Sequence, residues 1–413
     1  MLLPLKICFS AFGICVSLLV GYGLTQIAWQ PERVTPETFP VTEPRLANGD
    51  VDYFSALMTQ HYSDLRKHPE KNGFPRIKKR MQDEKIIFPA DEPERENWVA
   101  EHEAFLDELS EAVKEPYFLP EWKRPEGLLF NLNFCDENET QIKLARMLEA
   151  RVKRSVKAGD PERAIDALLA LYLLGRKVGQ GPGLVPLTVE TGIESMAQSR
   201  LKELLDSKKV TVSQLNRLEA GLASLPAPLT LSEIQDRNQF IAFDALQRFL
   251  HAPFTRETAD SLSAKESWLR HFIDKNIVRE YFYRKWRALR AIESEPDPQK
   301  RQKQYELFEK NCLAASHSRS TASLFFLRGR SEYCGAMALA LLIPSENYQL
   351  DAALRKSEAA FQLVCLSVRL ERFRLQKTEF PAASFPDGPA FPSAPLLPKN
   401  AEGPHSLTNQ PPQ

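Results

Sequence analysis

Four short patterns in this chain combine residue types that could do chemistry, and the first is His102-Glu103. It begins like the H-E-x-x-H zinc motif, in which two imidazoles one helical turn apart hold the metal and the glutamate acts as a base. Leu106 stands where the second histidine belongs, so the ligand set is incomplete. The 7 histidines of the chain form no close helical pair. We therefore predict no metal site and no cofactor.

Ser199 and Lys202 form the second pattern, S-x-x-K, which places a nucleophile and a base as in penicillin-binding proteins and β-lactamases. The companion K-T-G element is missing, because Lys377-Thr378 is followed by Glu379. The chain also contains no G-x-S-x-G nucleophile elbow. The sequence therefore predicts no catalytic residue from a linear motif.

The third pattern is the glycine-rich stretch 179–183, Gly-Gln-Gly-Pro-Gly. A phosphate cradle of this kind follows a strand and donates several backbone amides. Here the preceding residues have helical periodicity, and Pro182 removes one amide donor. We interpret the stretch as a helix terminator and turn.

The fourth pattern is a basic and aromatic segment, 279–290. At 100° per residue one face is apolar and consists of Val278, Phe282, Trp286, Leu289 and Ile292. The remaining positions carry the candidate contacts for an anionic surface, Arg279, Arg284, Arg287 and Arg290. The favoured alternative is a bundle helix whose cationic back is solvated and balanced by Glu293 and Glu295. Formal net charge is +0, so we expect no nucleic-acid partner.

The N-terminal segment sets the expected location. No charged residue occurs from Ile7 to Gln30, about 24 residues, which is enough to cross a bilayer core as a helix. Lys6 precedes the segment, so residues 1–6 are expected in the cytoplasm and the body on the exported side of the cell membrane. The alternative is a signal peptide cleaved after Gly23. We favour an uncleaved single-pass anchor over residues 7–30, with the membrane as the first partner.

Proline marks both borders of the soluble body. Residues 31–49 carry four prolines and are expected to form an extended stem, and the helical body should occupy 50–377. Residues 378–413 are expected to be a disordered tail. In it, prolines recur at every third position, which matches a polyproline II face that could dock a protein partner: Pro386, Pro389, Pro392, Pro395 and Pro398.

Capping signals divide the body into helices. Asp160-Pro161 and Asp297-Pro298 are typical helix starts, and Thr211 with Gln214, Thr230 with Glu233 and Ser263 with Glu266 fit capping boxes. No sustained period-two alternation occurs, so the fold class should be all-α. The expected helices are 51–66, 95–114, 138–157, 161–177, 186–206, 212–224, 231–250, 263–293, 298–317, 320–343 and 346–377.

Two of these helices show how the body should pack. Leu144, Leu148 and Val152 form an i, i+4 stripe, and residues 164–175 are apolar on nearly every side, which is typical of a central helix. The hairpin 138–177 resembles one tetratricopeptide unit at Gly159 and Ala164. No second copy follows at a 34-residue spacing, so we expect an irregular helical array.

Cysteine usage gives no ligand set. The chain has 6 cysteines and no C-x-x-C pattern. Cys8 and Cys15 lie in the predicted anchor, and the other four are expected to be small buried residues: Cys135, Cys312, Cys334 and Cys365. If the body is exported, a disulfide between Cys312 and Cys334 is the alternative.

The chain resembles a group of membrane-anchored, all-helical bacterial envelope proteins without an assigned activity. His102 stands where that group would carry asparagine, and Thr378 where it would carry glycine. The resemblance implies an architecture and an envelope location only. It rests on Asp52-Tyr53-Phe54-x-Ala56-Leu57, Trp98-x-x-x-His102-x-Ala104-Phe105-Leu106, Leu144-Ala145-Arg146 with Gly159-Asp160, Gln180-Gly181-Pro182, and Arg369-Leu370-Glu371-Arg372-Phe373-Arg374.

The leading functional prediction is a membrane-anchored envelope scaffold or protein-binding module without catalytic activity. The alternative is an envelope hydrolase, active on peptidoglycan or peptides, whose residues converge from separate helices. A cleft with paired carboxylates of raised pKa would favour the enzyme. A concave, apolar, helix-lined groove would favour the binding module.

Overall fold

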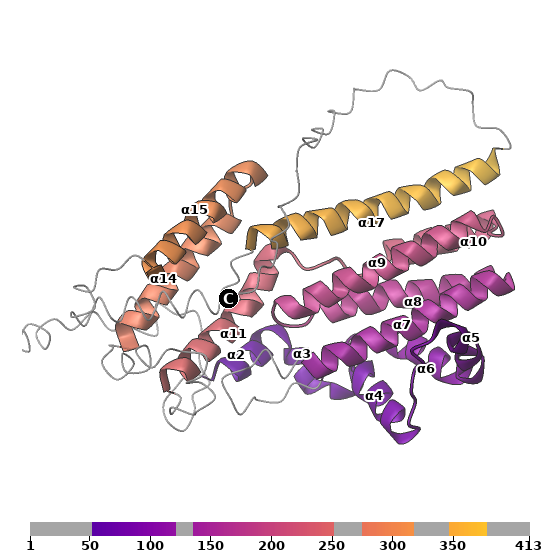
Figure 1. Ribbon diagram of the computed structural model, residues 1–413, viewed down its shortest axis with the longest axis horizontal. Helices are drawn as coiled ribbons and strands as arrows, with labels where there is room; N and C mark the ends of the chain where they lie inside the picture. Colours follow the sequence, from indigo (N-terminus) through magenta and orange to yellow (C-terminus); the bar gives the residue numbers. More distant parts are fainter. Residues whose placement is uncertain (1–51, 121–134, 252–274, 318–346, 378–413) are drawn as a thin grey trace, which may run out of the picture.

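The computed structural model describes residues 52–120, 135–251, 275–317 and 347–377 (Figure 1). It is 82% helix, with 13 α-helices and no strand among the residues described, which confirms the all-α prediction. The predicted anchor 7–30, the stem and the proline-rich tail lie outside the described residues. Within the described ranges, no helix combines the length and the apolar character needed to cross a bilayer.

Short helices open the described part of the chain: α2 (Tyr53–His61), α3 (Ser63–Lys67), the 3-10 turn η2 (Pro69–Lys71), α4 (Gly73–Asp83), α5 (Glu92–Glu101) and α6 (Glu103–Lys114). Two of the expected helices are each broken in the middle, at Tyr62 and at His102. Helix α4 was not predicted. The side chain of Asn72 caps it and also bonds the backbone of Leu119 in both directions, at 2.7 and 3.0 Å.

The main bundle consists of four helices and the last described helix: α7 (Cys135–Ala158), α8 (Pro161–Gly179), α9 (Leu184–Asp206), α10 (Val212–Ala223) and α17 (Asn347–Gln376). Figure 1 shows α17 along the outer edge, beside α9 and α10. Four of the five predicted caps are confirmed, at Asp160, Thr211, Thr230 and Asp297, and the fifth, Ser263 with Glu266, lies outside the described residues. Asp160 accepts from the amide of Arg163 at 3.1 Å, and Thr211 forms its capping box with Gln214.

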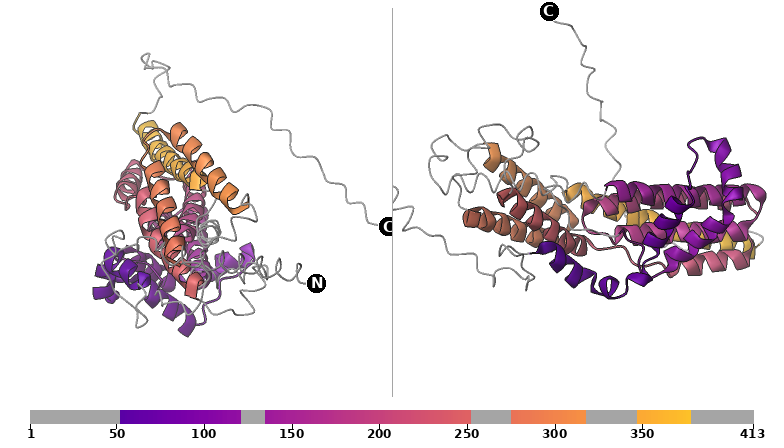
Figure 2. Two further views of the ribbon diagram at one scale, coloured as in Figure 1. Left: turned by 90° about the vertical axis from the view of Figure 1, so that its left-hand side faces the viewer. Right: turned by 90° about the horizontal axis from the view of Figure 1, so that it is seen from below.

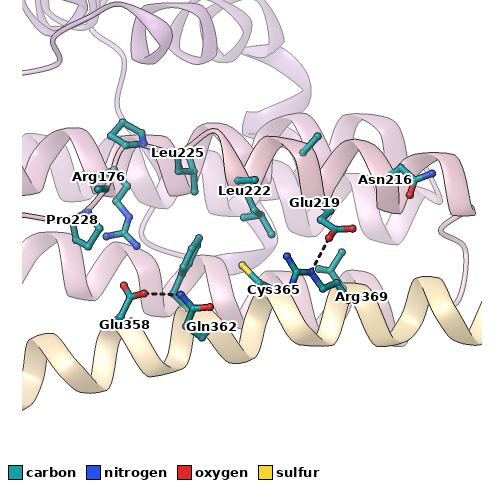
Figure 3. A pocket seen from close by; sticks show the side chains of 16 residues that line it. Arg176, Asn216, Glu219, Leu222, Leu225, Pro228, Glu358, Gln362, Cys365 and Arg369 are labelled. Atoms are coloured by element: carbon teal, nitrogen blue, oxygen red, sulfur yellow. Dashed lines mark hydrogen bonds and ion pairs between the residues drawn. The ribbon is translucent and has the colours of Figure 1, made fainter.

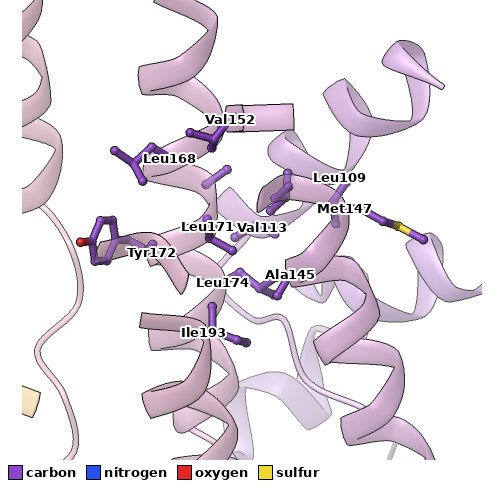
Figure 4. Close-up of a cluster of buried hydrophobic side chains, with 14 of the residues drawn as sticks. Leu109, Val113, Ala145, Met147, Val152, Leu168, Leu171, Tyr172, Leu174 and Ile193 are labelled. Carbon is purple, nitrogen blue, oxygen red and sulfur yellow. The ribbon is translucent and has the colours of Figure 1, made fainter. Parts of the chain in front are cut away.

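The first hydrophobic core joins α4 to α10 and α17. The predicted stripe of Leu144, Leu148 and Val152 is fully buried in it, and so is most of α8 (Figure 4). Helix α8 therefore occupies the central position that its all-round apolar character predicted. Truncating one of these leucines to alanine would cost on the order of 2–5 kcal/mol.

A second core lies at the other end of the molecule (Figure 2). It joins α2 and α3 to three later helices, α11 (Leu231–His251), α14 (Lys275–Glu293) and α15 (Pro298–His317). Aromatic rings fill much of it. Tyr53 stacks on Phe243 with centroids 5.8 Å apart, and Phe282 stacks on Trp286 at 6.4 Å. The first described helices thus complete a core built mainly from residues after 230.

The glycine-rich stretch 179–183 connects the two ends, and the prediction of a helix terminator and turn is confirmed. Helix α8 ends at Gly179, and Gly183 takes φ +87 before α9 begins. The carbonyl of Gln180 accepts from the hydroxyl of Tyr62 at 2.7 Å and from the guanidinium of Arg237. This turn therefore joins α8 to helices of the second core.

Candidate functional site

The arginine-rich helix predicted as a candidate anionic surface is α14. Its apolar face is buried in the second core, as the bundle-helix interpretation predicted. Arg290 pairs with Asp236 at 2.7 Å and with Glu293 at 2.8 Å. Arg284 and Arg287 are exposed, and the side chain of Arg279 lies outside the description. Arg284 pairs with Glu280 at 3.5 Å, and Arg287 lies over the ring of Tyr283, 5.8 Å from its centroid, so both exposed arginines contact side chains of their own helix.

The other predicted patterns have structural roles or lie outside the described residues. His102 stacks on Trp98 with centroids 4.3 Å apart, while Glu103 pairs with Arg151 and Arg154. No group of three metal-binding side chains occurs within the described part of the chain. Ser199 is exposed, on the surface of α9. The five prolines of the docking prediction, 386–398, are outside the described residues, as is Cys334.

Two cavities lie side by side along α17. The first, of about 430 Å³, is bounded by α10, the 224–228 segment and α17 (Figure 3). The second, of about 400 Å³, is bounded by α9, the 228–231 segment and the first half of α17. Arg176, Pro228 and Glu358 line both cavities, so the two form one groove that passes over Arg176.

Apolar side chains make most of the wall of the first cavity. Leu222 and Leu225 project from one side and Cys365 of α17 from the other (Figure 3). Phe361 of α17 also lines this cavity. Cys365 is a free, half-buried thiol that packs against the first core and also lines the groove, so the buried position predicted for it is found only in part. Burial raises the pKa of this thiol, which keeps it protonated and weakly reactive at neutral pH.

A buried ion cluster forms the floor of the groove. Arg176 extends from the end of α8 between two carboxylates that lie one turn apart on α9. Its Nε is 2.9 Å from Glu194, and its Nη1 is 3.4 Å from Glu190. The guanidinium also lies over the ring of Phe361, 5.0 Å from the centroid. All three charged side chains are at most 4% exposed, so their charges interact with little screening.

Burial separates the protonation behaviour of the two carboxyls. Burial, reinforced by the charge of Glu194, raises the pKa of Glu190 to about 8. Burial also raises the pKa of Glu194, while Arg176 and the hydroxyl of Ser357 act to lower it. At neutral pH, therefore, Glu190 is mainly protonated, and Glu194 is the carboxyl that lies closest to Arg176. This arrangement avoids an uncompensated buried charge.

Four buried polar atoms in and beside this cluster have no hydrogen-bond partner among the residues described: Nε of Arg176, Oε1 of Glu194, Oε2 of Glu190 and the hydroxyl of Tyr172. The first two lie 2.9 Å apart as an ion pair, so Oε2 of Glu190 and the hydroxyl of Tyr172 are the two atoms that no described residue pairs with. Glu190 lines the second cavity. Its carboxyl lies against Gly179, where a β-carbon would overlap it. A buried polar atom without a partner costs on the order of 1–3 kcal/mol. A donor or acceptor supplied by a bound molecule in the second cavity would recover part of that cost.

The groove was not predicted from the sequence, because its residues come from α8, α9, α10 and α17. One local signal existed. Glu190 and Glu194 interrupt the apolar positions of α9 at i, i+4 spacing, and Arg176 ends a helix that is otherwise apolar. Buried charges at such positions need partners from other helices.

Comparisons of the chain with protein-family models, with curated proteins and with solved structures found no match.

Proposed function

We propose that this chain is a binding module whose groove along α17 takes a peptide segment of a protein partner. The observation that carries this is the continuous pair of cavities, apolar along most of its wall and polar at its floor over Arg176. Pockets of this composition bind by burial of apolar groups and orient the ligand by a few polar contacts. A segment with apolar side chains and one donor near Glu190 would complement it.

We also propose that the module is tethered to the cell membrane by residues 7–30, with its body on the exported side. The uncharged run Ile7–Gln30 and the lysine before it support this. The full chain should then stay in the membrane pellet after extraction with carbonate. Release of a body whose N-terminus follows Gly23 would show cleavage instead.

Selection from a random peptide library displayed on phage tests the groove. The bait is the full chain in detergent, and selected peptides are measured by fluorescence anisotropy. Ala220→Trp places a large ring in the first cavity from an exposed position. It should raise the dissociation constant of the selected peptides at least tenfold, while Ser199→Trp, exposed on α9, should leave it unchanged. Equal binding to both variants would rule out the groove as the peptide site.

A hydrolase is the second candidate, because the raised pKa values of Glu190 and Glu194 are a feature of acid–base sites. It ranks lower because both carboxyls contact Arg176, and Glu194 lines neither cavity. Incubation with purified peptidoglycan separates the two functions. Release of soluble fragments that is lost in Glu190→Gln, with peptide binding retained, would establish the enzyme.

A further inference from the structure

Helix α17 carries a row of large apolar side chains on its outward face, which we name the outer stripe. Its members are exposed to solvent to a degree unusual for their type: Leu363 63%, Leu366 49%, Leu370 50% and Phe373 36%. The other exposed large apolar residues in the described ranges are scattered singly, as Ile87, Val185 and Leu307. Single exposed leucines are normal, whereas a contiguous row marks an interaction surface.

The helix cannot turn this stripe inward, because its opposite face is occupied. Val368 is fully buried in the first core, where Phe361 and Val364 pack against the same cluster. Polar contacts hold the same orientation at both ends. Ser357 bonds Glu194 at 2.7 Å, and Arg369 pairs with Glu219 at 2.8 Å. The stripe therefore belongs to the outer surface in the folded chain.

The spacing within the stripe is that of a coiled-coil seam. Leu363 and Leu370 are seven residues apart, and Leu366 and Phe373 each follow three residues later. This assigns the first two to heptad positions a and the others to positions d. A seam of this kind needs a second helix with the same repeat, because each side chain fits between four residues of the facing helix.

We propose that the outer stripe pairs with the outer stripe of a second copy of this chain, as an antiparallel two-fold helix pair. In this register Leu363 lies opposite Phe373 of the partner subunit, and Leu366 opposite Leu370 of the partner subunit. The two-fold axis passes near residue 368, so each contact occurs twice. All four members of the stripe are then covered, which is the self-complementarity that an isologous interface requires.

The charges beside the stripe favour a like surface over an anionic one. Arg369 and Arg372 both pair with Glu219, and Arg374 pairs with Glu371 at 2.6 Å. Two carboxylates of the same chain thus balance three arginines, which leaves one positive charge per chain from these groups beside the stripe. Two such surfaces approach without strong repulsion, whereas an anionic lipid surface would find little uncompensated positive charge. None of the stripe residues lines the groove, so the pairing and the proposed peptide site are separate.

The mass of the full chain in detergent, measured by light scattering on a sizing column, tests the pairing. The wild type should have the mass of two chains. Leu363→Glu with Leu370→Glu should give one chain, with a dissociation constant raised at least tenfold. The matched control is Leu307→Glu, which places the same charge at an exposed leucine of α15 and should leave two chains. A wild type that remains one chain at tens of micromolar would overturn the proposal.

Cysteine cross-linking tests the register in a background in which all six native cysteines are replaced by serine. A mixture of Leu366→Cys and Leu370→Cys copies should form a mixed disulfide several-fold faster than either copy forms one with itself. Equal self-linking of Leu366→Cys would indicate parallel helices and overturn the proposed pair. Cross-links from α17 to residues 318–346 of the same chain would also overturn the proposal, because that segment would then be what covers the outer stripe. Binding to anionic vesicles that Leu363→Glu removes would overturn it as well, because the stripe would then contact a lipid surface.

Discussion

Ser357 of α17 donates a hydrogen bond, 2.7 Å long, from its hydroxyl to Oε2 of Glu194 on α9. The two residues are 163 positions apart in the chain. Glu194 is also the carboxylate nearest to Arg176. The last described helix is therefore attached to a buried ion pair that belongs to the centre of the first bundle, and this bond is one of the contacts that hold the wall of the groove in place.

Replacing Arg176 by methionine should destabilise the fold by about 3–5 kcal/mol, because Glu194 would remain buried without its countercharge. Chemical denaturation followed by circular dichroism measures this. The double variant Arg176→Met with Glu194→Gln should recover at least half of the loss, since no buried charge is then left. A single variant as stable as the wild type would show that the ion pair contributes nothing.

Glu190 should make stability fall as pH rises towards 8. Its pKa is about 8 in the folded chain and 4.5 as the reference for the unfolded chain. Between these values the folded state holds the proton and the unfolded state does not, so unfolding releases a proton and the free energy of unfolding decreases with pH. The stabilisation is fully present below pH 4.5 and lost above about 8.

Glu190→Gln should therefore flatten the pH dependence of stability, and the sharpest window is pH 7–8. Burial raises the pKa of Glu293 to about 7, so Glu293 contributes a fall of the same sign that is largely complete at pH 7. Above that, a slope of roughly 1 kcal/mol per pH unit belongs to Glu190. Denaturation midpoints at pH 6, 7, 7.5 and 8 measure it. An unchanged slope in Glu190→Gln would assign the titration elsewhere.

Gly179→Ala should destabilise the chain by about 1–3 kcal/mol, because the new methyl group would overlap the carboxyl of Glu190. A second variant, Glu190→Ala, removes the carboxyl and so makes room for the new methyl group in the double variant Gly179→Ala with Glu190→Ala. In the double variant the cost of the alanine should fall to a few tenths of a kcal/mol. A cost that persists without the Glu190 carboxyl would point to the backbone of α8 instead.

The hydrogen bonds that the Gln180 carbonyl accepts from Tyr62 and Arg237 should together contribute about 1–2 kcal/mol to the free energy of unfolding. Tyr62→Phe removes the 2.7 Å bond to the Gln180 carbonyl and leaves the ring that packs under Arg237. Arg237→Met removes the second donor to the same carbonyl. Each change should lower the free energy of unfolding, and the pair should be non-additive since the acceptor is shared. Strictly additive losses of unfolding free energy would contradict a shared acceptor at Gln180.

The helices were largely predictable because their start signals are local. Capping residues such as Asp297, whose carboxylate accepts from Gln299 at 2.9 Å, fix a helix start through neighbours in sequence. The predicted helix 298–317 matches α15 at both ends. The breaks at Tyr62 and His102 were missed because neither residue is a helix breaker. Tyr62 is held by Gln180 and His102 by the ring of Trp98, and both arrangements depend on packing.

The groove and the outer stripe differ in how much of each could be predicted from the sequence. The a and d spacing of the stripe was already present in the sequence, but its exposure follows from the way Val368 faces the core. The ion cluster required knowing that α8, α9 and α17 meet, which long-range packing decides. Arg176 was interpretable as a helix end, and only its contact with Glu194 gives it another role.

The second core cannot be completed until late in synthesis, because α2 and α3 pack against helices that are made much later. Tyr53 packs against Phe243, and a ribosome adding about 5–20 residues per second needs roughly 10–40 s to cover that interval. Throughout that period the apolar sides of α2 and α3 lack most of their native partners, because Leu119 is the one buried member of the second core described between α3 and α11. Contacts this distant in sequence also slow folding itself. The opening segment of the body is therefore the part that a chaperone would have to shield longest, and an early stop in synthesis would leave it uncovered.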